Sequence, residues 1–284
     1  MAVAERKAVR EVGGCSMVGF VKIGKDSITG RVVFKVSKTS PAFLNALRRS
    51  IMENVPTMAI EMVEFRKNNS ILYDEFLAHR LGLIPLSTDL KSYKEWDKKT
   101  SLDDAPASMT LHLTLKAKGP RTVFAKDLKS KDPAVKPVYG DMPIVSLLDG
   151  QELEFDAVAV LGRGSDHSKF CPGRSWYRHY PNIKINDKIV DNPDSFVDSS
   201  PLKIFRVSGG RVVVDKEKFE DALVDNASFE SVDGGPISIE DSPDEFIFHY
   251  EPWGQLSPKE SLETAFENLA NDFENLQSSI KDAS

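Results

Sequence analysis

A regular stripe of large apolar residues runs along a helical segment near the C-terminal end of the chain. Ser257 is placed to cap this helix, Pro258 suits its first position, and Glu260 completes a capping box. Apolar residues then recur at alternating four- and three-residue steps, as in a coiled-coil seam: Leu262, Phe266, Leu269, Phe273, Leu276 and Ile280. Removing such a stripe from water is worth at most on the order of 10 kcal/mol. Either the sheet of the chain itself or a helix of a partner subunit therefore covers it.

The composition is that of a globular protein with room for two or more compact units, since the chain has 284 residues, 40% apolar and 28% charged. Only Cys15 and Cys171 occur, which is too few for a four-cysteine metal site and suits a reducing cytoplasm. The N-terminal residues form no apolar targeting segment, and no window approaches the length of a membrane span. A net charge of -6 argues against a protein that binds nucleic acid over its whole surface. We expect a cytoplasmic protein with no membrane contact and little or no direct nucleic-acid contact.

Residues 40–65, SPAFLNALRRSIMENVPTMAIEMVEF, predict a helix followed directly by a strand. Ser40 is placed as the N-cap, Pro41 suits the first helical position, and Pro56 ends the helix. Four-residue spacing puts three large apolar side chains on one helical face, namely Phe43, Leu47 and Ile51. This face requires a covering surface.

Two adjacent arginines, Arg48 and Arg49, lie within this otherwise apolar helix. A guanidinium group stays charged at any working pH and forms paired hydrogen bonds to carboxylate or phosphate groups. The pair could hold an anionic substrate, which predicts a free-standing α+β enzyme acting on a phosphorylated compound. Alternatively, it belongs to a surface on which another protein chain is assembled, or forms a surface salt bridge of little energetic value.

The other patterns indicate an α+β chain. Residues 18–37 predict a hairpin around GKDSITG, and residues 71–81 predict a helix that ends at Gly82. SMTLHLTLKAKG and ELEFDAVAVLG alternate between apolar and polar residues, as half-buried strands do. Residues 186–240 contain two short strands, PLKIFRV and GRVVVD, separated by turns and an acidic segment. A strand, DEFIFHYEPWG, precedes the terminal helix.

Several constellations look like chemical sites but lack residues that the chemistry needs. Glu75 and His79 lie one helical turn apart, yet no third metal ligand is near them in sequence. GRGSDH lacks the Gly-Lys-Ser/Thr ending of a phosphate loop. Asp166 and His167 have no serine or cysteine in a context that suggests a hydrolase triad. We therefore predict no catalytic residues and no metal site. The basic residues 116–136 form either a solvated loop or a local nucleic-acid contact.

Three stretches carry a family resemblance: FLNALRRSIMENVPTMAIEMVEFRKNNSILYDEFLAHRLGLIPL, GRGSDHSKFCPGRSWYRHYP and DEFIFHYEPWGQLSPKESL. From about residue 16 onward, the chain resembles the D subunit of archaeal DNA-directed RNA polymerase. That family includes the third-largest subunit of eukaryotic RNA polymerase II and the bacterial alpha N-terminal domain. The resemblance implies an α+β fold with a discontinuous dimerisation domain, an antiparallel sheet plus two helices, over residues 16–65 and 241–284. An inserted α+β domain would occupy residues 66–185, and a ferredoxin-like domain residues 186–240.

The resemblance further implies a non-catalytic assembly subunit of DNA-dependent RNA polymerase. The chain would pair with the small L subunit, and the pair would recruit the large B subunit and the small zinc-binding N and P subunits. The implied heterodimer interface consists of Phe43, Leu47, Ile51, Leu262, Phe266, Leu269, Phe273 and Leu276. The implied contacts with other subunits are Arg48, Arg49, Glu53, His79, Arg80, His167, Lys169 and Phe170. The alternative is the free-standing enzyme.

Many members of this family hold an iron–sulfur cluster in the ferredoxin-like domain. Here Ser200 precedes Pro201 where the family often has Cys-Pro, and no cysteine occurs in residues 186–284. Because such clusters normally need four thiolate ligands, we predict a ferredoxin-like remnant without cluster and no cofactor in the chain. The remnant should be held together by its own apolar residues alone, namely Ile204, Phe205, Val212, Val214 and Phe219.

Overall fold

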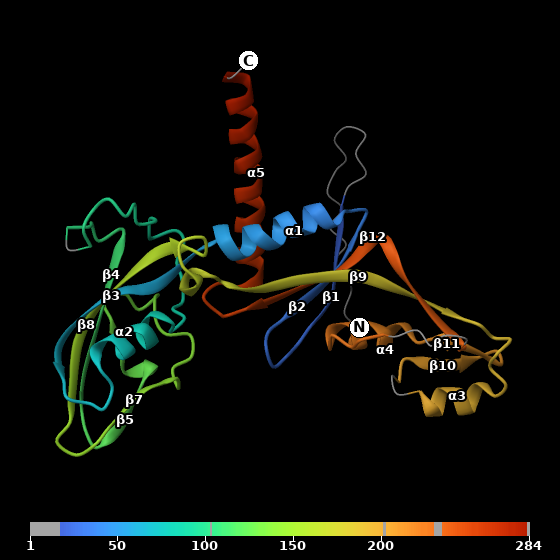
Figure 1. Ribbon diagram of the computed structural model, residues 1–284, viewed down its shortest axis with the longest axis horizontal. Coiled ribbons are helices and arrows are strands. Elements are labelled where there is room, and N and C mark those ends of the chain that lie inside the picture. The colour runs from blue at the N-terminus through green and yellow to red at the C-terminus, as the bar shows by residue number, and fades with distance from the viewer. Residues whose placement is uncertain (1–17, 103, 201–202, 230–234, 283–284) are drawn as a thin grey trace. The chain divides into compact units, whose positions relative to one another are not determined.

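The computed structural model describes residues 18–102, 104–200, 203–229 and 235–282 (Figure 1). The chain divides into two compact units, each built from stretches that lie far apart in the sequence. The first unit comprises Met1–Ala46 and Ser175–Glu251, and the second comprises Leu47–Arg174 and Pro252–Ser284. Antiparallel pairing joins the strands within each of the main sheets. The predicted α+β class is therefore confirmed.

A four-stranded sheet forms the centre of the first unit. Its strands are β1 (Gly19–Lys25), β2 (Val32–Ser37), β9 (Gly173–Ile185) and β12 (Ile237–Pro252), in the order β1-β2-β12-β9. The predicted hairpin is confirmed, because β1 and β2 pair antiparallel and Asp26 N–H donates to Arg31 O across the turn at 2.8 Å. A strand was expected at DEFIFHYEPWG, which begins at residue 244, but β12 already begins at Ile237. The sequence did not predict β9.

A smaller layer of helices and a hairpin packs on one face of this sheet. It contains α3 (Pro193–Ser199), β10 (Phe205–Ser208), β11 (Arg211–Val214) and α4 (Lys216–Val224). Part of the acidic segment, for which no helix was predicted, forms α4, which is capped by Asp215, whose side chain accepts from Lys218 N–H. Its apolar core includes the predicted residues, but Val33 and Ile247 of the sheet belong to the same buried cluster. The prediction that this part is held by its own residues alone is therefore wrong.

Two arginines, Arg31 just before β2 and Arg178 of β9, contact the C-terminal end of α4. Arg31 Nη2 donates to Val224 O and Arg178 Nη1 donates to Ala227 O, each at 2.7 Å. Positive groups are favourable there because the last carbonyl groups of a helix are unpaired and carry partial negative charge. His249 of β12 lies nearby, fully buried and stacked on Trp176 with ring centroids 4.9 Å apart. Burial, with further contributions from Arg178 and Arg31, lowers the pKa of His249 to about 3.

The helix predicted after Ser40 begins where expected. Its first turn is closed by Leu44 N–H donating to Ser40 O at 3.2 Å, and α1 spans Pro41–Arg49. The last turn widens into a π-helix, η1 (Ser50–Asn54), and β3 (Pro56–Asn68) follows directly. Proline at the start of β3 ends the helix, since it supplies no N–H for a further helical hydrogen bond.

A second four-stranded sheet forms the centre of the second unit. It consists of β3, β8 (Glu152–Arg163), β4 (Thr110–Lys118) and β6 (Lys129–Ser130), in the order β3-β8-β4-β6. The alternation predicted for β4 is confirmed, because Leu111, Leu113 and Leu115 are buried while His112 and Lys116 are exposed. The remaining elements are α2 (Asp74–Gly82), β5 (Arg121–Phe124), η2 (Ala125–Asp127), β7 (Pro143–Leu147) and η3 (Ser168–Phe170). The helix α2 begins later than predicted, at Asp74.

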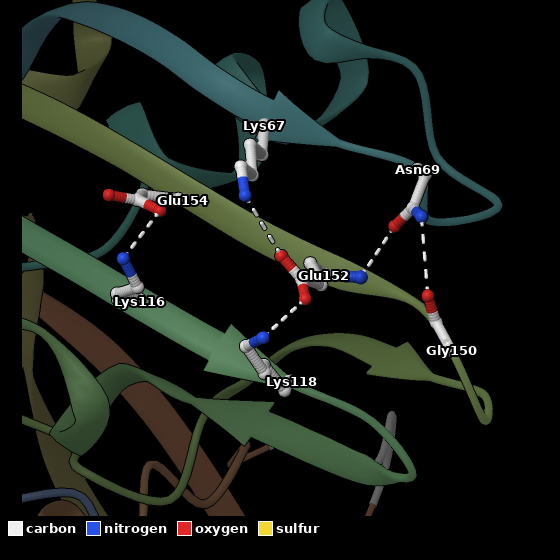
Figure 2. A network of polar contacts seen from close by, with 7 residues as sticks. All are labelled: Lys67, Asn69, Lys116, Lys118, Gly150, Glu152 and Glu154. Carbon is white, nitrogen blue, oxygen red and sulfur yellow. Dashed lines mark hydrogen bonds and ion pairs between the residues drawn. The ribbon is translucent and has the colours of Figure 1, made fainter.

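The outer face of this sheet carries ion pairs between neighbouring strands. Figure 2 shows Glu152 of β8 between Lys67 of β3 and Lys118 of β4, with Lys116 bonded to Glu154 at 2.9 Å beside them. Lys118 and Lys67 together lower the pKa of the Glu152 carboxyl. In the basic segment 116–136, Arg121 and Lys126 also have carboxylate partners, Asp127 and Asp141. Much of the positive charge of this segment is thus neutralised within the chain, which favours a solvated surface.

The terminal helix α5 spans Pro258–Asp282. The predicted capping box is confirmed, because Glu260 N–H donates to Ser257 Oγ at 3.2 Å and Ser257 N–H donates to Glu260 Oε2 at 3.1 Å. Within the described part of the chain, no helix combines the length and apolar character needed to span a bilayer.

Candidate partner-binding surfaces

The helix α5 packs against η1 through small and polar residues. Ser50 Oγ donates to Ala265 O at 2.8 Å, and Asn268 Nδ2 donates to Asn54 O at 3.0 Å. The residues of α5 that are fully enclosed are Ser261 and Ala265. Segments from both ends of the chain therefore meet, but the contact uses the face of α5 that carries small side chains.

The large apolar side chains of α5 point away from this contact. Phe266 is 38% exposed, Phe273 65%, Leu276 56% and Ile280 59%, while Leu262 and Leu269 are half-buried. Every residue from 270 to 282 is exposed, and in Figure 1 α5 runs as one straight helix to the C-terminal end. Isolated exposed apolar residues are common in proteins, but a stripe along one helix marks a surface that another chain covers. Of the two covers considered from the sequence, the sheet of the second unit does not supply one for this outer half.

The predicted interface residues from the helix at 40–55 lie in a different environment. Leu47 and Ile51 are 0% exposed, so the chain itself encloses both side chains. Phe43 is half-buried. Leu47 and Ile51 therefore offer no free surface to a partner.

The arginines that raised the question of an anionic substrate are in contact with their own helix. Arg49 Nε and Nη2 donate to the two carboxylate oxygens of Glu53 at 3.2 and 2.9 Å. This pairing raises the pKa of Arg49 and lowers that of Glu53. Arg48 is half-buried, and its Nη1 lies 3.7 Å from Met52 Sδ. The Arg49–Glu53 pair is solvent-exposed, so solvent screening leaves it little effect on stability.

The GRGSDH segment serves as a packing loop against η1. Ser165 N–H donates to Glu53 O at 3.0 Å, and Asp166 N–H donates to Arg163 O at 2.9 Å. A side chain at Gly164 would overlap Met52 O, so glycine is needed for the close approach of the two backbones. Phosphate-binding loops rely on free backbone N–H groups. Because these amides have intrachain acceptors, the loop gives no support to the phosphate-dependent enzyme.

Replacing Gly164 by alanine is expected to destabilise the protein by roughly 1–3 kcal/mol, because the added methyl group forces the loop and η1 apart. Urea unfolding of Gly164→Ala against the original chain measures the change. Gly150→Ala is the control, since its Cβ would meet nothing within 4 Å and only its backbone, with φ of 75°, would be strained. Equal stability of Gly164→Ala and the original chain would contradict the role given to this glycine.

Three of the predicted subunit contacts hold the second unit together. Lys169 Nζ donates to Ile60 O at 2.9 Å and also pairs with Glu61. Phe170 is buried, and Thr57 Oγ1 donates to its carbonyl oxygen at 2.6 Å. Arg80 donates to Ile144 O and Pro143 O of β7. Phe170 thus has a structural role and little surface for a partner.

His79 and His167, predicted separately from distant stretches, line one pocket together with Lys169. Both histidines are exposed, and His167 Nδ1 accepts a hydrogen bond from Lys169 N–H at 3.1 Å. Glu75 does not line this pocket, and no cluster of three or more potential metal ligands occurs among the residues that the structure describes. Sequence analysis missed the exposed Leu83, Tyr139 and Trp253, which line a neighbouring pocket and follow no periodic pattern.

Comparisons with known proteins agree with the resemblance found in the sequence. Residues 60–171 match the family described as RNA polymerase Rpb3/RpoA insert domain. The DNA-directed RNA polymerase subunit Rpo3 of Pyrococcus horikoshii is 39% identical over 259 residues, covering 89% of this chain and 93% of that protein. The subunit Rpo3 of Pyrococcus furiosus is 39% identical over 245 residues, covering 84% and 88%. That of Natronomonas pharaonis is 33% identical over 259 residues, covering 91% and 96%. The chain therefore belongs to the Rpo3 family of DNA-directed RNA polymerase subunits, the D subunits of archaea.

Proposed function

We propose that this chain is the assembly platform of an RNA polymerase, and that it acts by pairing with the small L subunit. As an Rpo3 family member it is a non-catalytic component of the DNA-directed polymerase complex. The heterodimer then recruits the large B subunit and the small zinc-binding N and P subunits. The chain itself makes little or no contact with nucleic acid and works in the cytoplasm.

The observation that carries this proposal is the exposed apolar stripe of α5. Its small residues Ser261 and Ala265 face η1, while Phe273, Leu276 and Ile280 face solvent. The spacing of these large residues suits a second helix, because alternating steps of four and three keep the side chains on one face. Residues 16–65 and 241–284 would serve as the dimerisation domain, and residues 66–185 as the insert that meets the other subunits.

Co-expression with the small subunit tests the proposal. We expect a stable one-to-one complex on size exclusion. The chain alone should self-associate or aggregate, because its apolar stripe is then exposed to solvent. A well-behaved monomer that binds a phosphorylated ligand saturably, and does not bind the small subunit, would contradict it.

We also propose that residues 186–240 fold without an iron–sulfur cluster. The support is the absence of cysteine from residues 186–284, together with an apolar core shared with the sheet through Val33 and Ile247. Iron and acid-labile sulfide are expected to be absent from protein purified without oxygen. Stoichiometric amounts of both would overturn the proposal.

A further inference from the structure

Arg31, Arg178 and His249 gather between the central sheet of the first unit and the C-terminal end of α4. The two guanidinium groups donate to carbonyl groups at that end of the helix and just beyond it. His249 pairs across the sheet with Val33, which shares a buried cluster with apolar residues of α4, so the imidazole faces that helix as well. Trp176 stacks on His249 and lies two residues before Arg178 on β9, which places both of these β9 side chains on one face. We call the three basic side chains the α4 basic cluster.

Several nitrogen atoms of the α4 basic cluster are buried without a hydrogen-bond partner among the described residues. They are Arg31 Nε, Arg178 Nε and Nη2, and both ring nitrogens of His249. His249 is 0% exposed, so bulk solvent does not reach its ring. Buried polar groups in folded proteins nearly always have a partner. Unpartnered donors from three neighbouring side chains therefore indicate a ligand that they share.

The two unpartnered atoms of Arg178 are the pair with which arginine binds two oxygens side by side. Elsewhere in this chain, Arg49 uses Nε and Nη2 to bind both carboxylate oxygens of Glu53. Arg163 uses the same two atoms to bind Glu95, at 2.7 Å each. The planar fork of a guanidinium group matches the spacing of oxygens in a carboxylate, phosphate or sulfate. The fork of Arg178 thus has the geometry of an oxyanion site.

The charge of Arg178 has no carboxylate partner in the part of the chain that the structure describes. Burial lowers the pKa of Arg178, and no neighbouring negative charge counters this effect. Asp26 lies at the rim of the cluster, with its Oδ2 3.7 Å from Arg31 Nη2, and balances the charge of Arg31 alone. A buried charge is costly unless an opposite charge accompanies it. An anion beside Arg178 would therefore stabilise the folded chain.

We infer that the α4 basic cluster binds one small tetrahedral oxyanion, inorganic phosphate or sulfate, which fastens the α4 layer to the central sheet. The fork of Arg178 holds two of its oxygens, and Arg31 Nε and a ring N–H of His249 donate to the others. A carboxylate has only two oxygens, both of which the fork would use. Because the donor atoms are buried, the site suits a free ion and not a phosphate group carried on a larger molecule. The inference does not depend on pairing with the small subunit.

Equilibrium dialysis of the full chain against radioactive phosphate tests the inference. The chain is kept dilute enough to be monomeric, and the ionic strength is held constant. We expect saturation at one phosphate per chain, with competition by sulfate and little competition by acetate or chloride. The urea midpoint of unfolding should rise once phosphate exceeds its dissociation constant, because the ion binds the folded state only.

Arg178→Lys separates the fork from the charge. Lysine keeps the positive charge and a donor for Ala227 O, but it cannot bind two oxygens side by side. We expect phosphate binding at least about tenfold weaker than in the original chain. Arg206→Lys is the matched control, since Arg206 is exposed on β10 of the same layer and should leave phosphate binding unchanged.

Arginine modification by phenylglyoxal locates the ion in the unaltered chain, so the test does not rely on a variant that folds. Reaction at Arg178 requires a local opening of the α4 layer, which a bound ion makes rarer. Phosphate should therefore slow modification of Arg178 and leave that of Arg206 unchanged, as measured by peptide mass spectrometry.

Two results would overturn the inference. The first is no saturable phosphate or sulfate binding, which would mean that water or a carboxylate of the chain itself satisfies the cluster. The second is binding that persists in Arg178→Lys and gives Arg178 no protection, which would show an adventitious ion only. Neither result bears on the proposed assembly role, which the pairing experiment tests separately.

Discussion

Replacing Phe273 and Leu276 by glutamate is expected to abolish pairing with the small subunit while leaving the free energy of unfolding of the isolated chain almost unchanged. Both side chains are more than half exposed, so the isolated chain buries neither and loses little. In the complex, each apolar side chain is worth about 1.5–3 kcal/mol on burial, and the new carboxylates would be desolvated as well. The combined loss corresponds to at least about a 100-fold weaker dissociation constant. Titration calorimetry measures it.

The matched control for this variant uses the opposite face of the same helix. Asn271 and Asn275 are exposed and lie off the apolar stripe, so Asn271→Glu/Asn275→Glu adds the same charge to α5. We expect this control to bind the small subunit within about threefold of the original chain, as surface substitutions change stability by about 0.5 kcal/mol or less. If both double variants bind equally well, the stripe is not the interface.

Acidification is expected to destabilise the chain strongly through His249. The ordinary pKa of histidine is 6.5, and burial beside Arg178 and Arg31 lowers that of His249 to about 3 in the folded protein. The folded state therefore favours the neutral imidazole. Neutral His249 therefore contributes fully to the free energy of unfolding above about pH 6.5. This contribution is lost progressively as the pH falls from about 6.5 to about 3. At pH 5 the loss is on the order of 2 kcal/mol, since one pKa unit corresponds to about 1.4 kcal/mol.

His249→Phe isolates this contribution from the other titrating groups. The phenyl ring keeps an aromatic partner for Trp176 and has no nitrogen to protonate. Urea unfolding gives the free energy of unfolding of each protein at pH 7 and at pH 5. The decrease between the two pH values should be about 2 kcal/mol smaller for the variant than for the original chain, since both proteins share the same titrating carboxylates. An identical pH dependence in the two proteins would show that His249 is not held neutral.

The elements predicted correctly are those whose signals are local. The N-cap Ser40 and the Ser257–Glu260 capping box fix helix starts through hydrogen bonds within a few residues, and Pro56 ends a helix because it has no N–H to donate. The alternation in β4 is clear because one face of that strand is buried and the other is solvated. These patterns depend on neighbours in sequence, so the sequence alone is sufficient.

The elements that were missed depend on distant partners. Most residues in the middle of β9 are half-buried on both faces, so the strand shows no alternation to detect. The helix α4 lies in an acidic stretch, but Phe219 and Leu223 pack with Val33 and Ile247, which are far away in sequence. The widening of α1 into the π-helix η1 accompanies the close approach of Gly164, which no local pattern encodes.

The candidate interface was predictable only in part. Large residues at regular spacing identified the stripe on α5, and its outer half is exposed as a partner surface requires. The same reasoning included Leu47 and Ile51, which the chain encloses, because periodicity does not distinguish an internal cover from an external one. Ser261 and Ala265, which are buried in the internal contact, are too small to be recognised as packing residues, and Ser261 is also polar.

Hydroxyl-radical footprinting of α5, with and without the small subunit, tests most directly whether a second chain covers the stripe. The account predicts strong oxidation of Phe273, Leu276 and Ile280 in the isolated chain, diluted until it is monomeric, and marked protection in the complex, with no change at Tyr73, which is exposed and lies outside α5. Equal oxidation of the three α5 residues in a stoichiometric complex would contradict it.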